Sequence, residues 1–264
     1  MDFKRIEWIL LVVFIGISIF LGFEIVQTPI HLSSSSQAHT SDFYSEMVSD
    51  NIVWPKKLTD TPQDAYYLAA SPSNSLAGVK VAGNQSYDRN EQALTVTLTK
   101  PLLLSSNRTK ALKQVLAFKN NDNNVAHGRE YSLDRLSSTN KSYQFDQQTS
   151  FGQLYYHGAR LQINIANGAI VSYRQTYLPQ VEAVREKQMT IGQRHALKLL
   201  YTLRELPNNS RVTQVELGYR RLTTVRNNII FLPVWRFGIE NRATGSVAAK
   251  QVNAFTGALL QNGN

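Results

Sequence analysis

The stretch ARLQINIANGAIVSYRQTY, residues 159–177, holds two runs of alternating apolar and polar side chains joined by Asn167-Gly168. Alternation with a period of two is typical of a strand that buries one face. An Asn-Gly pair between two such runs favours a type I′ turn, because both central positions of that turn need a positive φ. The stretch therefore predicts an antiparallel hairpin.

The pattern after this hairpin predicts one helix and three strands. Thr190 precedes IGQRHALKLLYTLREL, in which one helix face carries Ile191, Leu197, Leu200 and Leu203. The expected strands lie at Val212–Thr223, Phe231–Glu240 and Lys250–Gly257. In the second of these strands, Trp235, Phe237 and Ile239 alternate with Arg236, Gly238 and Glu240. A hairpin, a helix and three strands favour a helix packed on an antiparallel sheet, an α+β lobe.

The first half of the outer part shows a weaker pattern of the same kind. Ser41 is expected to cap a helix that runs to about Ile52, and Asn107 to cap a helix that runs to about Lys119. Between them, Ala93–Lys100 alternates like a strand, whereas residues 120–150 are polar and predict mainly loops. We therefore expect two α+β lobes, at residues 41–150 and 151–264.

An apolar segment lies near the N-terminus. From Trp8 to Phe23 the sequence carries no charge, and Ile6–Val26 is apolar apart from Glu7 and Glu24 near its ends. At a rise of about 1.5 Å per residue, a helix of this length just spans a hydrocarbon core of about 30 Å. The segment is thus expected to be a transmembrane helix.

Lys4 and Arg5 precede the apolar segment, so the positive-inside rule places the N-terminus in the cytoplasm and the rest of the chain outside the cell membrane. The alternative is a cleaved signal peptide, but the small-x-small candidates for cleavage, such as Ser36-Gln37-Ala38, lie far beyond Phe23. The expected order is a cytoplasmic start, a transmembrane helix, a flexible linker and the outer lobes, at residues 1–7, 8–26, 27–40 and 41–264.

Within the apolar segment, Ser18 and Gly22 form a small-xxx-small pair, which lets another membrane helix approach the backbone closely. With Ile15 and Ile19 they make the candidate helix–helix contact face. A pair of this spacing also occurs by chance in many apolar segments.

Composition removes several functional classes. The absence of cysteine excludes disulfides, zinc–thiolate sites and cysteine nucleophiles. Of the 28 Lys and Arg and the 19 Asp and Glu, two and three respectively lie before residue 25, so the outer part carries a charge of about +10. A basic outer part could bind anionic wall or lipid polymers, or could simply be a solvated basic surface. Nucleic acid is not an expected partner outside the cell.

No catalytic or metal-binding set stands out. The five histidines (His31, His39, His127, His157 and His195) include no pair at the helical spacing of a metal site. Ser138–Lys141 matches S-x-x-K, but it lies in a polar stretch and the sequence has no K-T-G partner. Tyr155, Tyr156 and Trp235 are expected in the sheet core rather than in a sugar-binding platform. The sequence therefore predicts a non-enzyme without catalytic residues, metal or cofactor.

Several stretches together resemble the YycI (WalI) family. They are MDFKRIEWI at the start of the apolar segment, NGAIVSYRQTYLPQVE from the hairpin, IGQRHALKLLYTLREL with VTQVELGYRRL, and FLPVWRFGIE with VNAFTG. The resemblance covers the apolar segment and most of residues 150–257, whereas residues 41–150 fit only in length and type.

This resemblance implies a function that composition does not. Members of the family are single-pass, non-enzymatic regulators of the essential sensor histidine kinase of Gram-positive bacteria, called YycG or WalK. They associate with that kinase and with the companion protein YycH, and together these tune a two-component system that controls cell-wall metabolism. The family's outer fold is α+β. The expected partners are therefore a YycG/WalK-like kinase, a YycH-like companion and the membrane.

Overall fold

The quoted hairpin forms as expected in the computed structural model of the chain. Strands β8 (Arg160–Ala166) and β9 (Ala169–Thr176) pair antiparallel and are closed by Asn167 and Gly168. The φ angles of these two residues are 50° and 71°, so both occupy the left-handed region that a type I′ turn requires. The Asn-Gly signal and the alternating runs are both confirmed.

The structure describes residues 8, 11, 13, 14, 17 and 38–261, and the chain divides into two units, Met1–Glu46 and Met47–Asn264. In the first unit, the described residues of the apolar segment are helical, and their side chains are exposed. Among the residues that the structure describes, no helix combines the length and apolar character needed to cross a bilayer.

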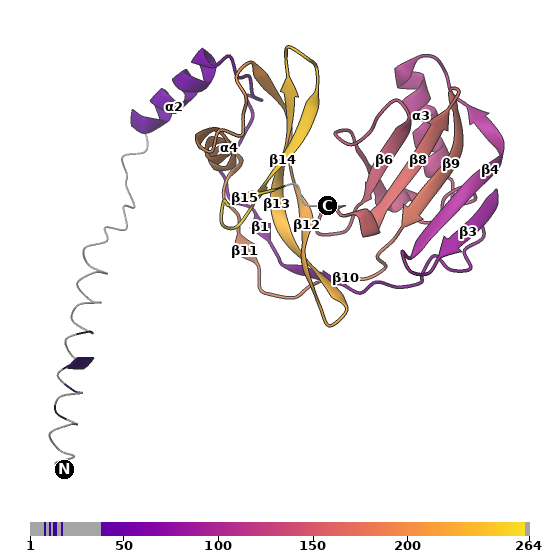
Figure 1. The fold of residues 1–264 in the computed structure, drawn as a ribbon, viewed down its shortest axis with the longest axis horizontal. Coiled ribbons are helices and arrows are strands. Elements are labelled where there is room, and N and C mark those ends of the chain that lie inside the picture. Colours follow the sequence, from indigo (N-terminus) through magenta and orange to yellow (C-terminus); the bar gives the residue numbers. More distant parts are fainter. Residues whose placement is uncertain (1–7, 9–10, 12, 15–16, 18–37, 262–264) are drawn as a thin grey trace. The chain divides into compact units, whose positions relative to one another are not determined.

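Six strands of the second unit form one antiparallel sheet in the order β3-β4-β9-β8-β6-β5 (Figure 1). The other four strands are β3 (Asn84–Asp88), β4 (Ala93–Leu103), β5 (Tyr131–Asp134) and β6 (Ser142–Gln147), and a short 3₁₀ turn, η1 (Gly128–Glu130), precedes β5. Residues 120–150, expected to be mainly loop, therefore contain two strands.

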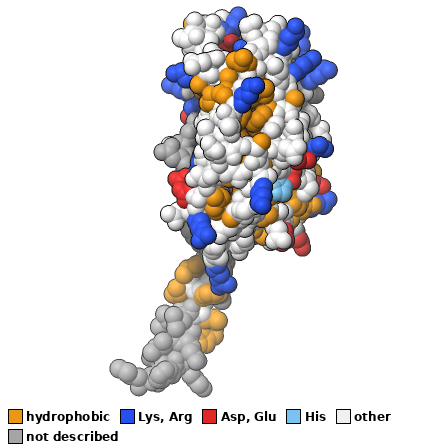
Figure 2. Space-filling model, turned by 90° about the vertical axis from the view of Figure 1, so that its right-hand side faces the viewer, with side chains coloured by type: hydrophobic (Ala, Val, Ile, Leu, Met, Phe, Trp, Pro, Cys, Tyr) orange, Lys and Arg blue, Asp and Glu red, His pale blue; other side chains and the backbone are white. Residues whose placement is uncertain are grey.

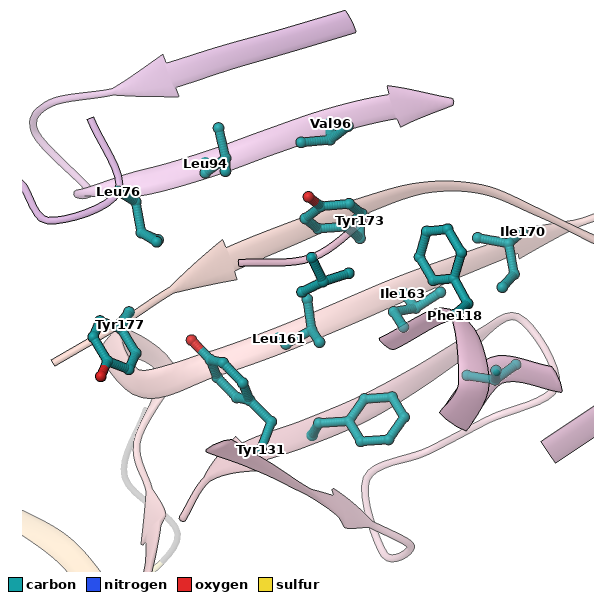
Figure 3. Close-up of a cluster of buried hydrophobic side chains, with 13 residues drawn as sticks. Leu76, Leu94, Val96, Phe118, Tyr131, Leu161, Ile163, Ile170, Tyr173 and Tyr177 are labelled. Carbon is teal, nitrogen blue, oxygen red and sulfur yellow. The ribbon is translucent and has the colours of Figure 1, made fainter. Parts of the chain in front are cut away.

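Helix α3 (Arg108–Lys119) packs on one face of this six-stranded sheet. Its N-cap is Asn107, as expected, and the side-chain oxygen of Asn107 accepts hydrogen bonds from the backbone N–H groups of Thr109 and Lys110. Figure 3 shows side chains of α3, β4, β8 and β9 directed toward one another in the resulting core. The ring of Phe118 from α3 meets that of Tyr173 edge-on, with centroids 6.3 Å apart. Burying each such side chain contributes about 1.5–3 kcal/mol.

A second sheet of seven strands has the order β10-β2-β13-β12-β7, with β14 beside β13 and β15 beside β14. Its centre is the long hairpin of β12 and β13. The strands are β2 (Leu68–Ala70), β7 (Gln153–Tyr155), β10 (Val181–Ala183), β12 (Ser210–Val225), β13 (Asn228–Asn241), β14 (Val247–Asn253) and β15 (Leu259–Leu260). Strands β1 (Asp64–Ala65) and β11 (Gln188–Met189) form a separate two-stranded pair, and the 3₁₀ turn η2 (His157–Ala159) follows β7.

Two helices begin at other residues than expected. Helix α4 (Gln193–Thr202) starts after Gly192, inside the expected stretch that follows Thr190, and the Thr190 hydroxyl accepts a hydrogen bond from the backbone N–H of Gln63. Leu197 and Leu200 are buried as expected, whereas Leu203 lies past the end of the helix and is exposed. Helix α2 (Ala38–Ser49) contains Ser41 and ends before Ile52.

The mixed α+β class is confirmed, with mostly sheet and three α-helices in the described part of the chain. The boundary expected near residue 150, however, does not separate the two sheets. Hairpin β8–β9 was expected in one lobe with α4 and the C-terminal strands. It belongs instead to the six-stranded sheet, because β9 pairs with β4 and β8 pairs with β6. Each sheet therefore takes strands from both sides of residue 150.

Candidate functional site between the two sheets

Strand alternation gives the six-stranded sheet a polar face. Phe145 and Leu161 belong to the core under α3, so their neighbours Asp146 and Arg160 point to the opposite side. Asp146 and Arg160 are direct cross-strand partners on β6 and β8. The Arg160 Nε donates to Asp146 Oδ1 at 2.7 Å. A buried carboxylate thus lies on the face that does not carry α3.

Arg236 reaches this carboxylate from the other sheet. It lies in β13, between the buried Trp235 and Phe237, and its side chain is only 6% exposed. Its Nη2 donates to Asp134 Oδ2 at 2.9 Å, and its Nη1 lies 4.0 Å from Asp146 Oδ2. A charged residue in a strand that is buried on both faces is therefore neutralised by carboxylates of the facing sheet.

An aromatic ring completes this contact. The guanidinium carbon of Arg236 lies 4.5 Å from the ring centroid of Tyr155, a cation–π distance. We name Arg236, Asp134, Asp146, Arg160 and Tyr155 the intersheet cluster. Both carboxylate side chains in it are completely buried.

The two carboxylates of the cluster have opposite pKa shifts. Burial raises the pKa of Asp134, but the hydrogen bond and charge of Arg236 outweigh it and hold the pKa below the usual value. Asp134 is also well satisfied, because its Oδ1 accepts the backbone N–H groups of Leu136 and Ser137. For Asp146, burial dominates the opposing charge of Arg160 and raises the pKa to about 7.

Asp146 is also less completely hydrogen-bonded. Among the groups of the described residues, its Oδ2 has no hydrogen-bond partner, and the same holds for Arg236 Nε. A buried carboxylate oxygen without a donor favours the protonated acid, which agrees with the raised pKa. Asp134 is therefore the anchoring carboxylate of the cluster, and Asp146 is the one that titrates near neutral pH.

Two glycines make room for groups at the cluster. A Cβ on Gly238 would lie 2.6 Å from Leu136 Cδ2, so a side chain here would collide with the β5–β6 loop. A Cβ on Gly218 would lie 2.5 Å from the Tyr155 ring. Glycine inside a strand often marks such a close approach. Gly238 therefore lets the β5–β6 loop of the six-stranded sheet approach, and Gly218 makes room for the Tyr155 ring within the seven-stranded sheet.

An open pocket of about 680 Å³ adjoins the cluster where β7, η2 and β8 meet β12. The parallel register pairs Tyr155 of β7 with Arg220 of β12. We call it the basic pocket, and its lining residues are Tyr155, Tyr156, His157, Arg160, Arg220, Arg221 and Leu222. Three arginines around one cavity can bind an anion.

Basic side chains elsewhere are more dispersed. Figure 2 shows Lys and Arg spread over the face on the side of β3 and β4, with apolar side chains between them. The basic pocket differs from that face because its arginines line one hollow.

The residues expected to form the membrane contact face (Ile15, Ser18, Ile19 and Gly22) lie outside the described residues, as do the topology residues Lys4 and Arg5. Ser138 of the S-x-x-K match lies in the β5–β6 loop, where its hydroxyl donates to the Asp134 carbonyl and accepts the Gln144 N–H. In the part of the chain that the structure describes, no group of three or more His, Asp or Glu side chains could hold a metal.

The aromatic residues singled out in the sequence have separate positions. Trp235 is buried, as expected, and its Nε1 donates to the Ile191 carbonyl at 2.8 Å. Tyr155 is also buried, whereas Tyr156 is only half-buried and lines the basic pocket. The intersheet cluster was not predictable from the sequence motifs described above. The signal available for it was one arginine inside the apolar run of β13.

The family model described as YycI protein matches residues 31–255 of this chain. No curated protein matches the sequence. The YpeB C-terminal domain of Bacillus megaterium aligns with a TM-score of 0.42 and 13% identity over 85% of this chain and 95% of that one. An uncharacterized protein from Eubacterium rectale ATCC 33656 aligns with a TM-score of 0.40 and 11% identity over 87% of this chain and 83% of that one. Both structural likenesses are loose, and the family assignment rests on the family model.

Proposed function

Since this chain belongs to the YycI family, we propose that it is a non-enzymatic regulator of the sensor histidine kinase called YycG or WalK. The observation that carries the proposal is the extent of the family match, residues 31–255. In this proposal residues 8–26 hold the protein in the cell membrane, with the N-terminus in the cytoplasm and residues 41–264 outside. A YycH-like protein is the second partner, and neither cofactor nor nucleic acid takes part.

Regulation in this topology acts through lateral contacts. In this proposal the signal passes between membrane helices or between outer domains, because residues 8–26 lie in the membrane and residues 41–264 lie outside it. Lipid tails are as apolar as leucine, so helices in a bilayer associate by close packing. We place the membrane contact on the face of Ile15, Ser18, Ile19 and Gly22.

Such a contact need not be strong to change kinase output. A regulator shifts a kinase between two states only by its difference in affinity for them. A difference of about 1.4 kcal/mol changes the ratio of the two states about tenfold.

The test replaces Ser18 and Gly22 with leucine in the full chain. The larger side chains would hold a partner helix away, so we expect less kinase to co-purify from membranes and an altered level of kinase phosphorylation. Gly16→Leu is the matched control, because a helix with 3.6 residues per turn places Gly16 on the far side from Ser18.

Two readouts separate the parts of the proposal. If Ser18→Leu/Gly22→Leu matches the control in both co-purification and phosphorylation, the membrane face is excluded. If the kinase and a YycH-like protein do not co-purify even with the unaltered chain, the regulatory role itself is contradicted.

A further inference from the structure

The basic pocket between η2 and β12 has the chemistry of an anion site. We propose that it binds a phosphate group, carried either by a small phosphoester or by a lipid headgroup. Its volume of about 680 Å³ lies within the range of about 300–1,000 Å³ that is usual for small-ligand sites. This site is additional to the contacts with the kinase proposed above.

Charge supports an anionic ligand. The lining residues include three arginines and one histidine, and no Asp or Glu. Arg160 is paired with Asp146, which is completely buried beside the pocket. Arg220 and Arg221 form no salt bridge with any carboxylate in the described part of the chain. Two guanidiniums at the pocket are therefore not neutralised by the protein.

The same arginines are held in place. Arg220 Nη1 donates to Gln251 Oε1 at 3.1 Å, and Arg221 Nη2 donates to Thr224 Oγ1 at 3.1 Å. The Arg221 guanidinium also lies 5.9 Å from the centroid of the Tyr156 ring. Because a guanidinium has five N–H donors, one fixed donor orients the group and leaves others for a ligand.

The electrostatic environment agrees with this arrangement. Burial lowers the pKa of His157, and the charges of Arg221, Arg160 and Arg174 lower it further, while Glu91 opposes them. Burial also lowers the pKa of Arg220. The pocket thus already disfavours a further positive charge, and a bound anion would relieve that repulsion.

Phosphate fits this set better than a single carboxylate does. One bidentate arginine already satisfies a carboxylate, which has one charge and two oxygens. A phosphomonoester carries a charge of about −1.5 to −2 and has three acceptor oxygens. Arg160, Arg220 and Arg221 reach the pocket from two different strands, β8 and β12, and so match a ligand with several acceptors.

The test measures binding of inorganic phosphate to the full chain in detergent micelles by isothermal titration calorimetry at an ionic strength of about 0.15 M, at which distant exposed charges are screened. Arg220→Gln/Arg221→Gln removes the two unpaired guanidiniums, and we expect its affinity for phosphate to fall about tenfold or more. The matched control is Arg204→Gln/Arg226→Gln, which removes the same charge from exposed positions outside the pocket. We expect its affinity to stay within about twofold of the unaltered chain.

Equal affinity in the two double variants would overturn the proposal, as would the absence of saturable phosphate binding to the unaltered chain. The single variant Arg221→Gln is included because Arg221 is exposed, so its replacement is not expected to disturb folding. This variant must also bind phosphate more weakly than the unaltered chain. The source of the phosphate is decided by reconstitution in phosphatidylcholine bilayers that contain either phosphatidic acid or oleic acid. Competition by phosphatidic acid alone indicates a lipid headgroup, and equal affinity in both bilayers indicates a soluble phosphoester.

Discussion

At the scale of single residues, Arg236 is the buried charge on which the intersheet contact depends. It lies inside the most buried strand of the molecule, and its main partner, Asp134, belongs to the other sheet. Taking two ions out of water costs several kcal/mol, and the pair repays that cost only while both members are present. The loss of either member alone is therefore expected to destabilise the contact strongly, because the other charge is left buried without its partner.

We expect Arg236→Met to lower the free energy of unfolding by about 3–5 kcal/mol, because it leaves Asp134 charged, buried and without its main partner. Urea unfolding of the purified chain measures the change. The double variant Arg236→Met/Asp134→Leu should recover a large part of this loss, since no buried charge is then left unpaired. A cost below about 1 kcal/mol for the single variant would contradict this role.

The raised pKa of Asp146 predicts that the stability of the folded chain depends on pH. Its pKa is raised from 3.8 to about 7, so between these values the folded state binds a proton more readily than the unfolded state does. Stability from this group is therefore full at low pH and is lost as the pH rises toward 7. His157 acts oppositely, because its pKa is lowered and the unfolded state takes up the proton first.

Comparison with Asp146→Asn isolates the contribution of Asp146, since His157 is common to both proteins. We expect the unaltered chain to lose more stability than Asp146→Asn between pH 5 and pH 7.5. Thermal unfolding at several pH values gives both curves. Parallel curves would show that Asp146 does not titrate in this range.

At this scale the sequence was a good guide to local structure. Asn107 as a cap and Asn167-Gly168 as a turn were predictable, because each acts on its own neighbouring backbone. Arg236 was not, because the period-two pattern put it on a polar face with Gly238 and Glu240. A charge there is buried only because another sheet covers it, and that contact joins residues about a hundred positions apart.

At the scale of elements, helix α3 depends on its N-cap. The Asn107 side chain accepts two backbone N–H groups, at 3.0 Å from Thr109 and 3.1 Å from Lys110. We expect Asn107→Ala to cost about 1 kcal/mol of stability, because these donors would lose their partner. Chemical denaturation measures it. Asn107→Ser keeps an acceptor and should cost clearly less, and an equal cost for the two variants would contradict the capping role.

Strands were predictable where one face is apolar, and less so where buried polar residues interrupt the pattern. Strand β4 and hairpin β8–β9 alternate clearly. Strand β6 does not, because it buries Asp146 and Gln147 together with Phe145. Gln147 is satisfied by the backbone of Leu178, a partner that the local sequence cannot identify. The polarity that indicated loops in residues 120–150 belongs partly to these buried strands.

At the scale of the whole outer part, the chain passes back and forth between its two sheets. It contributes β2 to the seven-stranded sheet, β3–β6 to the six-stranded sheet, β7 to the first again, then β8–β9, and finally β10 and the C-terminal strands. A cut near residue 150 therefore leaves both sheets incomplete.

We expect fragments 41–150 and 151–264, made separately, to lack cooperative unfolding, because β4 and β6 lose the partners that β9 and β8 provide. Circular dichroism during heating measures this, with the intact outer part as the control. A fragment that melts cooperatively by itself would show that one lobe is an independent domain, as the sequence analysis expected.

The pairing of β2 also affects how the protein forms during synthesis. Ala70 pairs with Val181 on one side and with Ile229 on the other, so the first strand of the seven-stranded sheet cannot complete its pairing until nearly the whole chain has left the ribosome. Contacts between such distant positions slow folding, and unpaired strand edges in the waiting chain invite aggregation. A chain of this topology is thus one that benefits from a chaperone until its last strands emerge.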